Sequence, residues 1–261
     1  MMKVDYIDHM GNDLSPIRAA VVSNGKTNLD KYVDDDLRYT PAAKSLIQFL
    51  ARGCTQGEWD SLVEEVEACT SDINGDISTV LNLVRHMPPH WTPFGHTAIT
   101  VYVKAPIFVA RQLGKHQVGF VWNEVSRRYV DSPPEFYVPD VWRGKAKDKK
   151  QGSSGTVFSE ATLVRTDYNT YDGYTYRELN YVALEVYKDL LADGVAPEQA
   201  RMVLPQSMMT EWYWTGNLYA FAKMFISRTD PHTQLETQQV AQMIGNIIQP
   251  LFPISWKALT Q

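Results

Sequence analysis

The sequence predicts a helix-rich α+β fold with a small sheet. Most periodic segments carry apolar residues at helical spacing, as 176–192 does. One segment, 97–104, alternates apolar and other residues, which is typical of a strand. Its 261 residues are enough for one large domain with a substantial core. The stripe of the helix at 176–192 consists of Leu179, Val182, Val186 and Leu190.

The N-terminal part predicts a short strand at 3–8 and a helix at 15–22. Thr40 and Pro41 cap and start the next helix, which is expected to end near Gly53. These signals are local, because each depends on the backbone preference of one or two residues.

Two further helices are expected before the strand at 97–104. Thr55 and Glu58 form a capping box for a helix that runs to about Cys69. Another helix should run from Ile77 to His86, where two consecutive prolines stop it.

The sequence from residue 106 onward predicts five more helices. One begins at Pro106 and ends at Gly114, and a short one starts at Pro197. The others are 176–192, 217–227 and 234–248, the last with Thr233 and Glu236 as a capping box.

Residues 143–155 are basic and rich in glycine and serine, which predicts a flexible loop. The simpler interpretation is a solvated turn. The functional alternative is a lid that attracts an anionic cosubstrate tail.

Composition excludes several classes of protein. A net charge of −5 argues against a general nucleic-acid binder. Two cysteines, Cys54 and Cys69, indicate a reducing compartment without a disulfide framework. No apolar run approaches the roughly 18–20 residues of a membrane span, and Asp5 and Asp8 lie where a signal peptide would be apolar. We therefore expect a cytoplasmic protein without a membrane partner.

The segment from Lys115 to Tyr129 concentrates polar chemistry. It supplies two arginines, a lysine, a histidine, a serine and an asparagine, with Glu124 as an acceptor for a base or ribose. A core element cannot bury so many polar groups without partners. The mixture with Phe120 and Trp122 favours a loop over an anionic, partly aromatic ligand, and an ordinary polar loop is the alternative.

This segment resembles the signature loop of the flavin-dependent thymidylate synthases, which opens Arg-His-Arg and continues Asn-Glu-x-Ser-x-Arg-Tyr. Lys115 and Gln117 replace the two arginines around His116, and the spacer from Gln117 to Ser126 is one residue longer than usual. Lysine lacks the guanidinium fork, so flavin phosphate binding differs in detail. The matching positions are Asn123, Glu124, Ser126, Arg128 and Tyr129.

Further blocks carry the same resemblance, in the same order. They are Met10–Ser15 with Arg18–Ser23, His90–His96 with Val103–Gln112, and Ala200–Pro205 with Trp214–Asn217 and Arg228–Gln234. The resemblance covers most of the chain, as one domain over 1–261 with variable insertions near 30–88 and 140–170.

The resemblance implies a small central antiparallel sheet flanked by helices, the thymidylate synthase-complementing protein fold. It also implies conversion of dUMP to dTMP with FAD, 5,10-methylenetetrahydrofolate and NADPH, in a homotetramer with shared active sites. The absence of a GxGxxG fingerprint fits a flavin cradled between subunits. The cofactor then supplies the chemistry, and the protein orients and polarises the substrate.

The resemblance also assigns residues to ligands. Arg228, Ser126 and His90 are the expected catalytic residues, with Arg228 on the uracil, Ser126 on the phosphate and His90 positioning folate and flavin. Lys115 could instead reach the nucleotide. The dUMP set is Gln112, Glu124, Ser126, Arg128, Arg201 and Arg228. The FAD set is Ser23, Thr92, Lys115, His116, Gln117, Asn123, Asn217 and His232.

Several of these residues have simpler interpretations. Arg228 could be a C-cap that complements a helix dipole, Arg201 a surface arginine, and His90 a satisfied turn histidine. A metal site from His86, His90 and His96 is not expected, because the two prolines prevent helical spacing. No base stands at triad spacing from Ser126, so a serine nucleophile is not indicated.

Two other functions remain open at this point. One is a binding-only homologue that keeps nucleotide and flavin but has lost turnover. The other is a nucleic-acid-binding module that uses Trp122, Arg127, Arg128 and the basic loop. The acidic net charge argues against the second.

Overall fold

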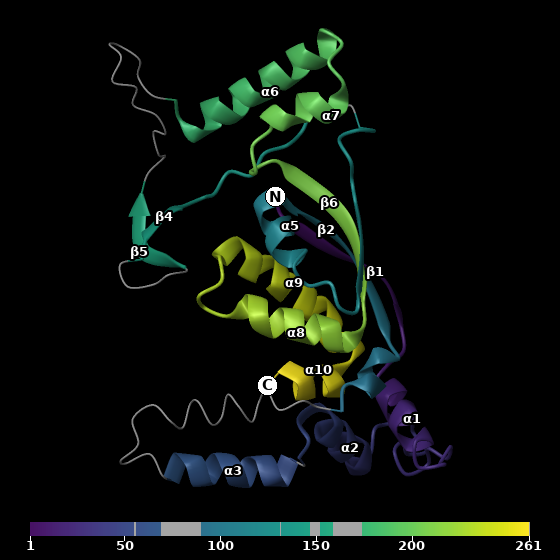
Figure 1. Ribbon diagram of the computed structural model, residues 1–261. Helices are drawn as coiled ribbons and strands as arrows, with labels where there is room; N and C mark the ends of the chain where they lie inside the picture. Colours follow the sequence, from purple (N-terminus) through teal and green to yellow (C-terminus); the bar gives the residue numbers. More distant parts are fainter. Residues whose placement is uncertain (55, 69–89, 131, 147–151, 159–173, 261) are drawn as a thin grey trace.

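A computed structural model describes residues 1–54, 56–68, 90–130, 132–146, 152–158 and 174–260. Strands and helices are mixed along the chain, which confirms the α+β prediction (Figure 1). The strands are β1 (Lys3–Met10), β2 (Ala98–Pro106), β3 (Phe120–Glu124), β4 (Trp142–Lys145), β5 (Ser153–Phe158) and β6 (Met209–Gly216). The helices are α1 (Leu14–Val22), α2 (Pro41–Arg52), α3 (Gln56–Ala68), α5 (Ile107–Leu113), α6 (Tyr176–Ala192), α7 (Pro197–Ala200), α8 (Leu218–Thr229), α9 (Leu235–Leu251) and α10 (Pro253–Thr260), with short 3-10 turns at Thr92–Gly95 and Arg201–Val203.

The main sheet has the strand order β1-β2-β6-β3, and every neighbouring pair is antiparallel. Helices α8 and α9 lie on one face of it (Figure 1). Alternation sends Trp212 and Trp214 of β6 toward that face, where both are buried, and leaves Tyr213 exposed on the other. The sheet therefore has one face that is covered by helices.

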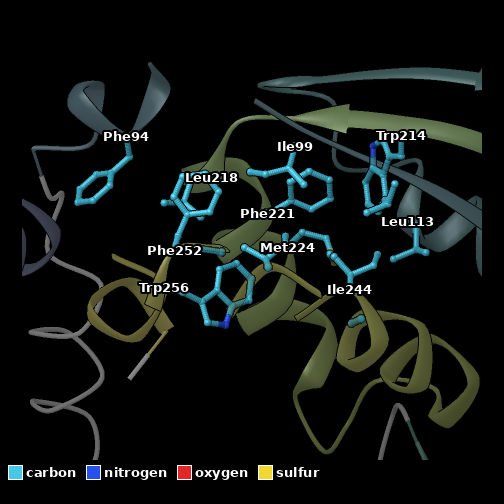
Figure 2. Close-up of a cluster of buried hydrophobic side chains, with 14 of the residues drawn as sticks. Phe94, Ile99, Leu113, Trp214, Leu218, Phe221, Met224, Ile244, Phe252 and Trp256 are labelled. Carbon is cyan, nitrogen blue, oxygen red and sulfur yellow. The ribbon is translucent and has the colours of Figure 1, made fainter. Parts of the chain in front are cut away.

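The core joins this sheet to the C-terminal helices. Trp214 of β6 contacts Phe221 of α8, and Met224 of α8 and Ile244 of α9 belong to the same buried cluster (Figure 2). Phe120 of β3 stacks on Trp214 with ring centroids 4.6 Å apart. Deleting one such large buried side chain typically costs about 3–5 kcal/mol.

The two ends of the chain are tied by a buried carboxylate. Asp13, fully buried before α1, accepts from the backbone N–H groups of Ile254 and Ser255 at 2.8 Å each. It thus satisfies free donors at the start of α10. Burial raises the pKa of Asp13, against the lowering effect of these hydrogen bonds.

Local capping signals predicted most helices correctly. Thr40 accepts from the backbone N–H of Ala43, and α2 ends at Gly53 with a left-handed backbone, as expected. The helices at 15–22, 106–114, 176–192 and 217–227 and the strands at 3–8 and 97–104 are confirmed to within two residues at each end. Thr55 and the predicted helix from Ile77 to His86 lie outside the described residues.

The predicted signature loop is partly wrong, because Phe120–Glu124 is a strand of the main sheet. Its pleat places Phe120, Trp122 and Glu124 on the covered face and leaves Val121 and Asn123 exposed. Of the polar residues that suggested a loop, Asn123 thus lies on the open face of the sheet and Glu124 at the end of the strand. Strand β6, with which it pairs, was not predicted.

Two other predictions also fail. Residues 143–155 are not one loop, because Trp142–Lys145 and Ser153–Phe158 pair as an antiparallel two-stranded sheet. Thr233 and Glu236 form no capping box: Thr233 donates to the carbonyl of Ser227 instead. Glu236 is buried and accepts from Nη2 of Arg143 at 2.9 Å, so a distant ion pair replaces the local cap.

Candidate active site

Arg228, in the last turn of α8, is held by two neighbours. Its Nε donates to Nε2 of His116 at 2.9 Å, and its Nη2 donates to the backbone carbonyl of Gln112 at 3.0 Å. These contacts join α8 to α5 and the turn after it. Among the described residues, Nη1 makes no hydrogen bond. The guanidinium is thus fixed on one side and available on the other.

His116 must be neutral to make this contact, because arginine can only donate and Nε2 has to accept. Burial, and secondarily the charge of Arg228, lowers the pKa of His116 to about 4. The imidazole therefore carries no charge at neutral pH, and its proton lies on Nδ1. Arg228 keeps the only positive charge of the pair.

Gln112 is locked from the other side by α9. Its Nε2 donates to Oε1 of Gln234 at 2.6 Å, and its Oε1 accepts from the hydroxyl of Thr237 at 3.1 Å. Thr237 is fully buried. Gln112, His116 and Arg228, which we call the Arg228 cluster, are thus brought together from segments more than a hundred residues apart. Sequence reasoning missed the supporting Gln234 and Thr237, since neither shows a local signal.

A cleft of about 630 Å³ lies beside this cluster. Cationic and polar side chains line one part of it, and two aromatic rings of β3 line another. Such a set fits a ligand with phosphates and a planar ring system. Its principal lining residues are Arg111, Lys115, His116, Gln117, Phe120, Trp122 and Glu124.

A tight turn leads from this cleft into β3. The backbone N–H of Phe120 donates to the carbonyl of Gln117 at 3.2 Å, and Gly119 has a φ of +81°. A side chain at Gly119 would come within 2.9 Å of Asn217 and of Ala220. Only glycine fits this turn without strain. The longer spacer of this chain therefore runs through a glycine turn packed against the start of α8.

Glu124 ends β3 between two clefts. It lines the cleft beside His116 and a second cleft of about 410 Å³ that includes Arg127, Glu198 and Arg201. The pleat directs Asn123 to the opposite face. Asn123 and Glu124 therefore serve different sides of the sheet, which is compatible with their expected roles toward flavin and nucleotide.

The residues after Glu124 contact mainly one another. The hydroxyl of Ser126 accepts from Nε of Arg128 at 3.2 Å, and the Arg128 guanidinium lies 5.0 Å from the ring centre of Tyr129. Arg128 and Tyr129 are exposed. Ser126 and Arg128 thus form a local pair of hydrogen-bonding side chains at or near the surface.

Three other predicted residues lie in a third cleft of about 360 Å³. Ser23, His90 and Thr92 line it, and the ring of His90 stacks on that of Phe49 at 5.5 Å. This cleft lies near α1, α2 and the turn at Thr92–Gly95, away from the Arg228 cluster. The structure of one chain therefore does not bring these residues to the cleft of His116.

Asn217 and His232 occupy structural positions as well. The side chain of Asn217 caps α8 by accepting from the backbone N–H of Ala220 at 2.8 Å. His232 is exposed, and its Nδ1 lies 2.9 Å from Oδ1 of Asp230. Neither residue lines the three clefts just described.

No group of three histidine, cysteine, aspartate or glutamate side chains is placed to hold a metal ion among the described residues. Among the same residues, no helix is long and apolar enough to cross a membrane.

Comparison with known proteins shows the family. The pattern of the thymidylate synthase complementing protein family matches residues 37–254. A flavin-dependent thymidylate synthase of Thermus thermophilus is 36% identical over 192 residues, which are 74% of this chain and 66% of that protein. The enzyme of that name from Thermotoga neapolitana is 30% identical over 256 residues, 98% of this chain and 89% of that protein.

A solved structure is similar to this chain over the whole fold. The UMP/dUMP methylase PolB from Streptomyces cacaoi, bound with 5-Br dUMP, superposes with a TM-score of 0.68 at 27% identity. The match covers 100% of this chain and 95% of that chain. The chain therefore belongs to the thymidylate synthase complementing protein family, and it is similar to flavin-dependent thymidylate synthases over most of its length.

Proposed function

We propose that this chain methylates dUMP reductively to dTMP, with FAD as cofactor, 5,10-methylenetetrahydrofolate as carbon donor and NADPH as reductant. Family membership supports the reaction class, and the methylase with 5-Br dUMP supports the nucleotide. The observation that carries the proposal furthest is the anchored guanidinium of Arg228, whose Nη1 remains for a ligand.

Arg228 acts on the uracil ring in this proposal. A guanidinium beside a ring carbonyl polarises it and stabilises negative charge as C5 becomes nucleophilic. The neutral His116 and the carbonyl of Gln112 fix its direction without cancelling its charge. Preorganisation of this kind lowers the barrier because the donor need not reorient during the reaction.

The remaining nucleotide residues divide by chemistry. Ser126, Arg128 and Arg201 supply donors for the phosphate, and Gln112 and Glu124 supply polar contacts for base or sugar. No residue near Ser126 could activate it as a base, among those that the structure describes, so its role is binding.

FAD, when bound, supplies the two-electron redox chemistry. Lys115, His116, Gln117 and Asn123 would hold it from the first cleft and the sheet edge, and Ser23, Thr92, Asn217 and His232 from other surfaces. His90 would position folate beside the flavin. The donor set of the first cleft fits, because cationic side chains there adjoin the rings of Phe120 and Trp122.

The dispersal of these residues supports a homotetramer with shared sites. In one chain some of them line three different clefts, and others, such as Asn217 and His232, line none of these clefts. Leu179, Val182 and Val186 of α6 also keep 40%, 39% and 40% of their surface exposed, so the described residues cover the apolar stripe only in part. Exposed apolar stripes of this kind mark protein contacts. A neighbouring chain would cover the stripe and complete the site.

Two residues of the nucleic-acid alternative, Trp122 and Arg127, already have contacts within the chain. Trp122 stacks on Trp212 with ring centroids 4.3 Å apart, and Arg127 donates to the carbonyl of Ser132. One face of the Trp122 indole is therefore covered, and the net charge of −5 also argues against binding to single-stranded nucleic acid.

Purified protein supplied with FAD tests the proposal. It should show oxidised-flavin absorption that dUMP perturbs, and it should form dTMP when folate and NADPH are added. Absence of FAD binding would contradict the proposal. Binding of flavin and dUMP without dTMP formation, and without rescue of a thymidine auxotroph, would establish the binding-only alternative.

A further inference from the structure

We infer that Thr210 is a positioning residue that fixes the carboxylate of Glu124 as the acceptor for the 3′-hydroxyl of the nucleotide. The inference rests on the proposed function for its ligand. It rests on the structure for the geometry, because Glu124 is held by two hydrogen-bond donors although it lies at the surface.

Thr210 and Glu124 are neighbours on the covered face of the sheet. Glu124 lies opposite Trp212 on β6, and Thr210 is two residues away on that strand, opposite Ala105 of β2. Thr210 is only 3% exposed. Its hydroxyl donates to Oε1 of Glu124 at 2.6 Å, a length typical of a hydroxyl bonded to an ionised carboxylate.

A second donor holds the other carboxylate oxygen. Nε1 of Trp122 donates to Oε2 of Glu124 at 3.2 Å. The indole cannot rotate freely, because it stacks on Trp212 at an interplanar angle of 16°. The two donors together define the plane of a carboxylate that would otherwise move on several side-chain torsions.

The carboxylate remains open to ligand despite these contacts. Glu124 is exposed and lines both the cleft beside His116 and the cleft of Arg201. Each carboxylate oxygen has two acceptor positions, and the protein donors described here use one on each. One acceptor position per oxygen is therefore left for a bound molecule.

The chemistry of dUMP restricts what Glu124 can bind. Its phosphate and both uracil carbonyls only accept hydrogen bonds, and its donors are N3–H and the 3′-hydroxyl. A carboxylate also only accepts, so it must take one of these two donors. Ser126, two residues after Glu124, is on the proposed phosphate side. The sugar lies next to the phosphate, so the 3′-hydroxyl is the donor in reach.

Two substitutions and one control test the positioning role. Thr210→Val keeps the shape and removes the hydroxyl, and Thr210→Ser restores it. Thr215→Val is the matched control, because Thr215 lies on the opposite face of β6 and its hydroxyl pairs with Thr100 at 2.9 Å. Thermal unfolding and flavin content confirm that each variant is folded and loaded.

We expect Thr210→Val to raise both the KM for dUMP and its Kd by calorimetry roughly 10-fold, as loss of a hydrogen bond to a charged group does. The value of kcat should change less than about 2-fold, since the contact is present in ground and transition states alike. Thr210→Ser and Thr215→Val should stay close to the parent protein. An unchanged KM in folded Thr210→Val would overturn the inference.

A nucleotide without the 3′-hydroxyl identifies the contact. The parent protein should bind 2′,3′-dideoxyuridine monophosphate more weakly than dUMP, whereas Thr210→Val should bind the two nearly equally. Glu124→Gln, which leaves Thr210 in place, should lose the same discrimination and serves if Thr210→Val does not fold. Retained discrimination in a folded variant contradicts the assignment. If the parent protein binds no dUMP, the proposed function itself fails.

Discussion

The Arg228 cluster and the segment Ser126–Tyr129 both carry cationic donors, but they are built differently. Arg228 is half-buried and bonded to two other elements, and Gln112 is bonded to a third. Arg128, in contrast, is exposed and contacts Ser126 and Tyr129 of its own segment. One region is organised within a single chain. In our proposal, a ligand or a neighbouring chain completes the environment of the other.

Because of this difference, substitutions in the two regions should affect the stability of the fold and the binding of ligand to different extents. Replacing a residue of the Arg228 cluster should disturb both the fold and the reaction, because its contacts exist before ligand arrives. Replacing Arg128 should disturb binding alone, because few contacts within the chain depend on it.

Arg228→Ala should have the largest effect. Loss of the polarising group is expected to lower turnover roughly 10²–10³-fold, by analogy with removal of one oxyanion donor. FAD content should remain, and the melting temperature should fall because two hydrogen bonds are lost. Steady-state kinetics and calorimetry measure both. Near-normal turnover would remove Arg228 from the mechanism, and Arg228→Lys serves as the charge-retaining control.

Arg128→Ala should weaken dUMP binding by roughly 10-fold, as expected for a lost charge-assisted hydrogen bond. The penalty should shrink at high salt, because the contact is exposed. The melting temperature without ligand should not change, which distinguishes this variant from Arg228→Ala. A clear loss of stability would mean that Arg128 is already part of the folded framework.

The pH dependence of stability probes the neutral state of His116. Its pKa is lowered to about 4 in the folded protein, below the ordinary value of 6.5, so the unfolded state binds the proton more readily. The folded state therefore loses stability as pH falls from 6.5 toward 4, by at most about 1.4 kcal/mol per pH unit. His116→Gln should show a shallower loss over that window in thermal unfolding. Parallel curves would contradict the neutral, buried imidazole.

The smallest effect is expected from the cysteines. Burial raises the pKa of the Cys54 thiol, so this group is not activated as a nucleophile. A Cys54→Ser, Cys69→Ser double variant should retain most of its turnover. Activity lost from a folded, flavin-loaded double variant would point to cysteine chemistry in place of cofactor chemistry.

The sequence predicts those parts of the fold whose signals are local. Thr40 caps α2 because its own hydroxyl reaches the third residue of the helix. The pairing of β3 with β6 could not be predicted in this way, since each strand is recognisable only by the side chains it places against the other. Glu236 likewise was assigned to a local cap, but the guanidinium of Arg143, far away in sequence, recruits it.

In the candidate site, too, individual residues could be predicted from the sequence, whereas their contacts with one another could not. Resemblance named Gln112, His116 and Arg228, but their mutual contacts depend on how α5, α8 and α9 pack. Thr210 and Thr237, which we assign to orienting this site, belong to no sequence motif. The role of a buried threonine hydroxyl depends on its hydrogen-bond partner, which is Glu124 for Thr210 and Gln112 for Thr237.

Hybrid oligomers test most directly whether these two regions from different chains share one site. At dUMP concentrations well below the parent KM, Arg128→Ala and Arg228→Ala oligomers should each have little activity. If each site takes its signature segment from one chain and its Arg228 from another, free mixing leaves roughly a quarter of the sites with neither defect. Co-expression should therefore raise activity well above both single variants. Verified hybrids that are no more active than the single variants would contradict shared sites and place both arginines on one chain.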